Sequence, residues 1–362
     1  MADTEIVNTD IIEINDIREI THFKGVSFSQ FRKTDVIKEL IKSLLDGKVE
    51  SACYWSAELI CSGHFLDLWD TIILFFSKYI HLGNPKLVNY IELRFTQFKH
   101  ILKNGYLDQE LKLRDNVKIR KLFAEIIIIF HYSKKKHPLT EIKIQSSHLD
   151  ALHSQYKYKA PTLSYITDYL LEEDLKDLVV PLNEFAFNLS LCGKNGLDAC
   201  YWIEWLIQFE KKCTTQHINI LGRRNFPEIH SKFQKDMVFC VWSIILGEAK
   251  VRSELIKRMI ESSFTLFCLK YSAGSFKKRK YLIYFSVELL TSEISNIPIV
   301  EDKSKIEQLL ANLNIIYKQI KKKEVSPGTD YLFTNIKNNN LEKTIVKLDT
   351  MNDFQTKFTP RL

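Results

Sequence analysis

The sequence predicts an all-α protein, and three observations support this fold class. Glycine and proline are scarce, with 11 and 8 among 362 residues, whereas a β-sheet protein of this length needs many tight turns that depend on both. Apolar residues recur at helical spacing, for example at Val36, Leu40 and Leu44. The chain is 45% hydrophobic and 26% charged, which is the balance of a globular rather than a disordered protein.

The expected organisation is two related multi-helix modules with an acidic arm before them and a flexible tail after them. The break between modules follows Lys134–His137, and the tail begins near Ser326-Pro327-Gly328. The expected boundaries are 1–29 for the acidic arm, 30–140 for module 1, 141–160 for the linker, 161–324 for module 2 and 325–362 for the tail.

The first 20 residues are acidic, with isoleucines between the carboxylates and Arg18 as the single basic residue. Such a segment is either a disordered arm or one that becomes ordered against a basic surface. The sequence leaves both possibilities open.

Helical periodicity in module 1 predicts a series of helices separated by glycine- and proline-containing breaks. The expected ranges are 34–47, 50–61, 66–81, 87–102, 107–113 and 117–132. The run Ile126–Ile129 is the one stretch where β-branched residues compete with helix formation. We predict a buried helix there because neighbouring strand-like segments are missing.

Module 2 shows the same periodicity. The expected helical ranges are 165–171, 175–180, 183–192, 198–213, 228–247, 250–271, 276–294 and 303–323. The last of them starts at Glu301-Asp302 and ends at Lys321–Lys323, which is the charge order that a helix dipole favours. The tail is polar and Asn-rich, with isolated apolar anchors at Tyr331, Phe333, Phe354 and Phe358.

The seven cysteines contain no Cys-x-x-Cys pair, and most of them neighbour Trp, Tyr, Leu or Ile. This pattern predicts reduced core thiols in an intracellular protein of the cytoplasm or nucleus. The first residues lack the basic start and apolar run of a signal peptide. The densest apolar runs are far shorter than the ~20 residues that cross a bilayer, so we expect no contact with membranes.

A four-residue phrase occurs twice. Ala52-Cys53-Tyr54-Trp55 returns as Ala199-Cys200-Tyr201-Trp202, and a Leu-Ile pair follows each copy at the same distance. The phrase could form a ligand site. We favour a packing role, in which Cys53, Trp55, Cys200 and Trp202 are the core of a structural repeat, because a small face beside a large ring suits helix packing.

The stretch around the first copy, about residues 38–86, resembles the C-terminal helical region of replication-fork AAA+ ATPases of the RarA/WRNIP type. The matching positions are Lys42-Ser43, Ala52, Tyr54-Trp55, Ala57, Gly63, Ser77 and Pro85. In that family this region serves oligomerisation and performs no chemistry. The ATPase module of the family has no counterpart here, since no G-x-x-x-x-G-K-[ST] motif occurs. In composition the chain also resembles uncharacterised proteins of large DNA viruses of protists and algae.

Motifs for chemistry are missing from the sequence. It contains no H-E-x-x-H motif or Cys/His quartet for zinc, no G-x-S-x-G nucleophile motif and no G-x-G-x-x-G dinucleotide motif. We therefore assign no catalytic residue, no metal ligand and no cofactor, and we lean against an enzyme.

Clusters of basic residues are the remaining signal of function. Residues 94–159 hold 14 Lys or Arg against six Asp or Glu, a second group is Arg223-Arg224, and a third, Lys277–Lys280, lies beside Tyr281 and Tyr284. Basic residues near aromatic ones can bind phosphates and stack bases, although they can equally form the solvated face of helices. The candidate surface for nucleic acid or an acidic partner consists of Lys112, Arg114, Lys118, Arg120, Lys121, Lys134, Lys135, Lys136, Lys277, Lys278, Arg279 and Lys280.

The leading functional hypothesis is a non-enzymatic interaction or scaffold protein that assists nucleic-acid processing. The partner would be a protein or a second copy of the chain, with nucleic acid as a further possibility. One alternative is a structural component of a virion or other large assembly, and a second is a helical enzyme of unfamiliar type. A viral protein would reside in the virion or the viral factory.

Overall fold

The structure, a computed structural model, describes residues 12–107, 109–136, 142–149 and 155–325. The described residues form helices and turns without a sheet, and one isolated bridge pairs Val26 with Arg32. The predicted all-α fold class is confirmed. The tail expected over residues 325–362 lies outside the described residues apart from Val325.

The helices of the first half follow the periodicity of the sequence closely. They are α1 Lys33–Leu45, α2 Val49–Cys61, α3 Phe65–Phe75, α4 Leu87–Lys103 and α5 Val117–Tyr132, with a π-turn at Phe76–Ile80 and a 3-10 helix at Glu110–Asp115. The isoleucine run of α5 is helical, and its side chains are buried. Core packing therefore outweighs the β-propensity of those residues. Asn116 caps α5 by accepting the backbone N–H groups of Lys118 and Ile119.

The second half contains α7 Val179–Leu189, α8 Gly196–Thr215, α9 Met237–Ala249, α10 Glu254–Cys268 and α11 Ala273–Thr291, followed by α12 Lys303–Ala311 and α13 Leu313–Lys321. The helices expected over 165–180 are only short 3-10 turns, at Thr167–Tyr169 and Lys176–Leu178. The side chain of Asp174 accounts for this difference. It accepts hydrogen bonds from the backbone N–H of Leu171 at 2.9 Å and from that of Gly222 at 2.8 Å. These bonds fix the backbone in a turn, although the apolar residues of the sequence continue at helical spacing there.

The two copies of the repeated phrase occupy the same place in two helical hairpins. In each hairpin, α1–α2 and α7–α8, the phrase begins at the fourth residue of the second helix. The rings of Tyr54 and Trp55 are 5.2 Å apart at 80°, and those of Tyr201 and Trp202 are 5.2 Å apart at 83°. The repeat is therefore a repeat of local structure as well as of sequence.

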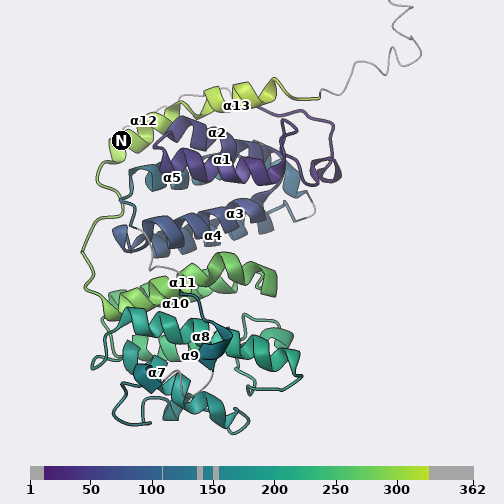
Figure 1. Ribbon diagram of the computed structural model, residues 1–362. Helices are drawn as coiled ribbons and strands as arrows, with labels where there is room; N and C mark the ends of the chain where they lie inside the picture. Colours follow the sequence, from purple (N-terminus) through teal and green to yellow (C-terminus); the bar gives the residue numbers. More distant parts are fainter. Residues whose placement is uncertain (1–11, 108, 137–141, 150–154, 326–362) are drawn as a thin grey trace, which may run out of the picture.

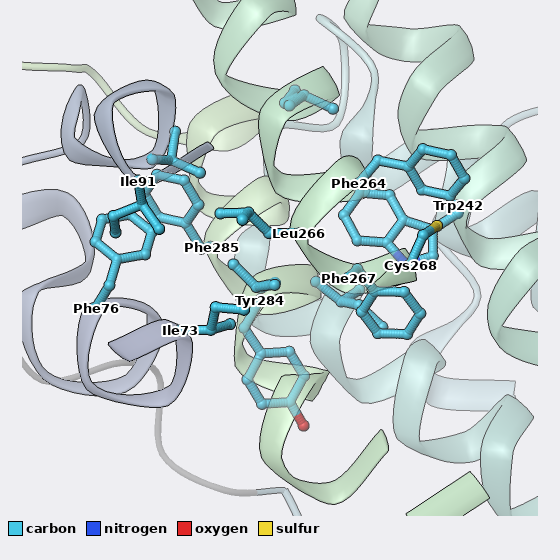
Figure 2. Packing of buried hydrophobic residues seen from close by; sticks show 14 of the residues in the cluster. Ile73, Phe76, Ile91, Trp242, Phe264, Leu266, Phe267, Cys268, Tyr284 and Phe285 are labelled. Carbon is cyan, nitrogen blue, oxygen red and sulfur yellow. The ribbon is translucent and has the colours of Figure 1, made fainter. Parts of the chain in front are cut away.

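The helices lie in successive layers, and the two halves meet where α4 packs against α10 and where α3 and the π-helix Phe76–Ile80 contact α11 (Figure 1). At this junction the ring of Phe285 on α11 contacts Phe76 at 5.0 Å and His81 at 5.3 Å, both edge to face. Figure 2 shows buried side chains continuing without a break from Ile73 and Phe76 to Trp242. One apolar core therefore runs through both halves.

The last two helices return to the first half of the chain. α12 packs against α5, and α13 packs against α2, so both helices contact the first half of the chain (Figure 1). Tyr317 and Ile320 of α13 are buried there in a small cluster with Phe23 and Phe28. The sequence boundary at 324 assigns these helices to module 2, whereas their apolar faces are covered by module 1.

The two tryptophans of the repeated phrase differ in burial. Trp202 is fully buried, at 0% exposure, with Tyr158 stacked on it at 6.0 Å. Trp55 is half-buried and contacts Phe31 edge to face. Cys53 and Cys200 are both buried, as expected of core residues. The expectation of two equivalent core tryptophans is thus corrected, because the segment that covers α8 has no full counterpart on α2.

The difference in burial predicts a difference in stability. Trp202→Ala should lower the free energy of unfolding by about 3–5 kcal/mol, because it empties a large enclosed site. Trp55→Ala should cost about 1–2 kcal/mol, since part of its ring already faces solvent. Urea denaturation of both variants would measure this, and equal losses would contradict the assignment.

Candidate nucleic-acid interface

The basic residues that the sequence groups together do not form one surface. Arg114, Arg120 and Arg279 are buried, whereas Lys135 and Lys280 are half-buried. The exposed members are Lys112, Lys118, Lys121, Lys134, Lys136, Lys277 and Lys278. The guanidinium groups are used inside the protein, which corrects the expectation that the arginines face a partner.

Arg114 and Arg120 bind the backbone of the N-terminal segment. Arg114 Nη2 donates to the carbonyl oxygen of Ile14 at 3.3 Å, and Arg120 Nη1 donates to that of Ile12 at 2.8 Å. Asp115 completes the contact, because its Oδ1 accepts both Arg120 Nη2 at 2.8 Å and the backbone N–H of Ile14 at 2.9 Å. The described part of the acidic arm is therefore ordered against basic residues, through its carbonyls rather than its carboxylates.

The same segment is tied to the chain beyond α13. The Ile17 N–H donates to the Val325 carbonyl at 3.1 Å, and the Val325 N–H donates to Asp16 Oδ2 at 2.9 Å. Burial alone would raise the pKa of Asp16, but hydrogen bonds from Arg18 and Val325 hold it below its usual value. Asp16 therefore stays ionised, and the adjacent guanidinium group of Arg18 compensates its negative charge.

Arg279 is a structural residue at the junction of the two halves. Its Nη2 pairs with Asp70 Oδ1 on α3 at 2.8 Å, and its Nη1 donates to the carbonyl oxygens of Phe267 at 2.9 Å and of Leu269. Those carbonyls belong to the C-terminal end of α10, where the helix dipole favours a positive charge. One side chain therefore joins α3, α10 and α11.

The lysines beside α5 lie at its two ends. Lys118 and Lys121 are in its first turns, while Lys134 and Lys136 follow its last residue, so about 17–21 Å of helix separates the groups. Lys135 donates to the His131 carbonyl at 2.6 Å, and burial lowers the pKa of its ammonium group. The structure does not bring these two groups together.

Lys278 of α11 and Lys270, which precedes this helix, border a cavity of about 340 Å³ between the two halves. Its apolar wall comes from α3, α4 and the end of α10, and its basic edge comes from residues on both sides of the α11 N-terminus. The lining includes Leu66, Trp69, Asp70, Phe95, Leu269, Lys270, Gly274, Lys278 and Arg279. Lys280 lies further along α11, 3.5 Å from Glu204. The cavity is therefore where part of the predicted basic cluster meets aromatic residues.

Sequence reasoning missed most of this cavity. Lys270 stands outside every basic run, and Trp69 and Phe95 read only as core residues of their helices. They come within reach of Lys278 because α3 and α4 pack beside α10 and α11. The part of the cluster that the sequence did indicate is the run Lys277–Lys280.

A buried acidic group lies elsewhere in the second half. Glu210 of α8 accepts the backbone N–H of Met237 at 2.6 Å and so binds the N-terminus of α9. Burial raises the pKa of Glu210 to about 7, the Met237 N–H opposes this shift, and the neighbouring Asp236 adds to it. Tyr271 donates to Asp236 at 3.3 Å. We assign this group a capping role because its contacts are to a helix end.

The cysteines are free thiols, and all but Cys192 are buried. Burial raises the pKa of Cys53 to about 12 and that of Cys240 to about 11, which disfavours the thiolate form needed for nucleophilic chemistry. Within the described residues, no group of three or more His, Cys, Asp or Glu side chains is placed to hold a metal ion. No helix in this part of the chain is both long and apolar enough to span a membrane.

Comparisons with known proteins add no family to this picture. The chain matches no family model, no curated protein and no solved structure. The resemblance of residues 38–86 to the RarA/WRNIP collar region therefore remains an expectation, and its matched positions lie mainly on the α1–α2 hairpin.

The contacts of Arg279 predict that it stabilises the fold. Arg279→Ala should lower the free energy of unfolding by about 2–4 kcal/mol, because it leaves Asp70 and the α10 carbonyls without their donor. The neighbouring exposed Lys277→Ala should change it by less than about 0.5 kcal/mol. Chemical denaturation would compare the two, and a neutral Arg279→Ala would show that the residue is available for binding instead.

The raised pKa of Glu210 predicts a pH-dependent stability. A carboxyl group that holds its proton more tightly in the folded state stabilises fully below pH 4.5, and this contribution is lost as pH rises to about 7. Glu210→Gln should match the wild type near pH 4.5 and exceed its stability above pH 7, by on the order of 3 kcal/mol. Urea denaturation at both pH values is the measurement, and a pH-independent difference would refute the assignment.

Proposed function

We propose that this protein is a non-enzymatic helical scaffold that assists nucleic-acid processing by holding the phosphate backbone at the α11 cavity. The supporting observation is the composition of that cavity, where Lys270, Lys278 and the N-terminus of α11 border an apolar wall. Backbone phosphates account for most of the affinity in binding without sequence preference.

The N-terminus of α11 is suited to an anion. The first turn of an α-helix carries backbone N–H groups without helical partners, and the helix dipole places partial positive charge there. In α11 the Ser275 N–H is already capped by Ser272 Oγ at 3.3 Å, so the N–H groups of Ala273 and Gly274 are the ones that would face an anion. Gly274 in this turn lines the cavity, and a Cβ built on it would meet only Ser272 Oγ, at 3.9 Å. The backbone is thus open to close approach by a phosphate.

The lysines can exchange their present contacts for a phosphate. Lys278 Nζ lies 3.8 Å from Asp70, and its side chain is 50% exposed, so this ion pair is weak. Lys270 is exposed on the other side of the same turn. Leu66 and Leu269 form apolar surface beside them, against which a sugar or base can pack.

The test is a charge reversal measured by binding to fluorescent single-stranded DNA of unrelated sequences at several salt concentrations. Lys270→Glu combined with Lys278→Glu should weaken binding by roughly tenfold or more for every sequence. Losing two phosphate contacts should also reduce the slope of log affinity against log salt by about 1.4.

The matched control is Lys211→Glu combined with Lys212→Glu, which makes the same change of net charge at exposed positions near the end of α8. It should leave the slope unchanged. Equal losses in both double variants would indicate a general field effect rather than a site. A wild-type protein that binds neither DNA nor RNA at low salt would refute the proposed function.

A further inference from the structure

The two repeated hairpins present equivalent surfaces, and one of them is covered by an extended segment of the chain. Tyr158 stacks on Trp202 at 6.0 Å with 17° between the ring planes. Lys157 and Lys159 on either side of it both pair with Asp198 of α8, at 2.7 and 2.6 Å. This segment, residues 157–161, is called the clamp here.

The clamp is also fixed through its backbone. The N–H groups of Lys159 and Ala160 donate to the carboxylate of Glu184 on α7 at 2.9 and 3.0 Å. Pro161 follows, and a proline keeps the residue before it extended. The clamp therefore consists of an aromatic ring for the tryptophan, flanking lysines for an acidic residue, and a proline that maintains the extended backbone.

The equivalent surface on α2 is an open groove. Its volume is about 500 Å³, and Trp55 lines it from α2 while α12 and α13 form the opposite wall. Ile315 of that wall is 57% exposed and adds apolar surface to the groove. Glu50 is the charged residue among those lining the groove. The groove thus offers an aromatic face, apolar walls and one carboxylate.

A second stretch of this chain has the character of the clamp. The clamp and the residues after it read Lys157-Tyr-Lys-Ala-Pro-Thr-Leu163, and residues 357–362 read Lys357-Phe-Thr-Pro-Arg-Leu362. Both begin with a lysine and an aromatic residue, continue to a proline, and place a leucine two residues after it. In the second stretch, Lys357 and Arg361 would complement the charge of Glu50.

We propose that residues 357–362 dock into the groove beside Trp55 of the same molecule, with Phe358 against the indole ring. These residues lie outside the part that the structure describes. The described chain reaches Val325, close after α13, and about 30 residues separate it from Lys357. A flexible connection of that length spans on the order of 30 Å, which exceeds the ~13 Å length of α13. Tethering gives the docked segment a high effective concentration.

The test is hydrogen exchange of the full-length protein, followed by mass spectrometry of peptides that cover residues 49–55 and 309–319. Phe358→Ala should speed exchange in both regions by roughly tenfold, because it removes the ring that covers Trp55. Phe354→Ala is the matched control, since it removes the same side chain four residues earlier and should leave both regions unchanged.

A change on the groove side gives an independent result. Ile315→Glu places a charge at an exposed position of the wall, so the fold should persist while the groove becomes unsuitable for Phe358. In this variant, exchange in residues 49–55 should rise to the level of Phe358→Ala, and adding Phe358→Ala should have no further effect.

Two outcomes would overturn the proposal. If Phe358→Ala and Phe354→Ala leave exchange unchanged, or change it equally, the segment does not occupy the groove. If protection of residues 49–55 increases with protein concentration, the groove binds a second copy of the chain instead of the tethered segment. Neither outcome bears on the α11 cavity, which Phe358→Ala leaves intact.

Discussion

The structure depends on the apolar contact between α11 and the segment that directly follows α3. Phe285 of α11 packs its ring against Phe76 and His81, and the core continues from there into both halves (Figure 2). His81 is buried, and burial lowers its pKa to about 3, so the imidazole stays neutral in this contact. Because hydrophobic burial is the main driving force of folding, this shared core makes the halves stabilise each other.

Buried arginines connect segments that the apolar core brings together. Arg120 joins α5 to the N-terminal segment and lies 3.9 Å from the ring centroid of Tyr317 on α13, so it connects both ends of the described chain. Arg279 does the same for α3, α10 and α11. Arginine suits such crossings because its planar group donates several hydrogen bonds in fixed directions while remaining charged.

The internal repeat places two similar aromatic pairs in the fold, one of them covered and the other beside an open groove. Both hairpins have the same aromatic pair at the same register, yet the clamp stacks a ring on Trp202, whereas Phe31 contacts Trp55 edge to face and leaves it half-buried. The C-terminal helices then form a wall beside Trp55 without closing the space. The groove beside Trp55 is open, and the α11 cavity is bordered by Lys270, Lys278 and Asp70. The two sites lie in different layers of the fold.

The sequence by itself determined most of the helices, because helical periodicity and breaks at glycine and proline are local properties, but it did not exclude helix over 165–180 or 228–236. The periodicity predicted α5 with its isoleucine run. The repeated phrase predicted that Cys53, Cys200 and Trp202 are buried packing residues. Tertiary structure alone decided that α12 and α13 return to module 1, that Trp55 stays half-buried and that Arg114, Arg120 and Arg279 are internal. The physical reason is that burying a charge depends on carbonyls and carboxylates from distant segments, and no local pattern records which segments will meet.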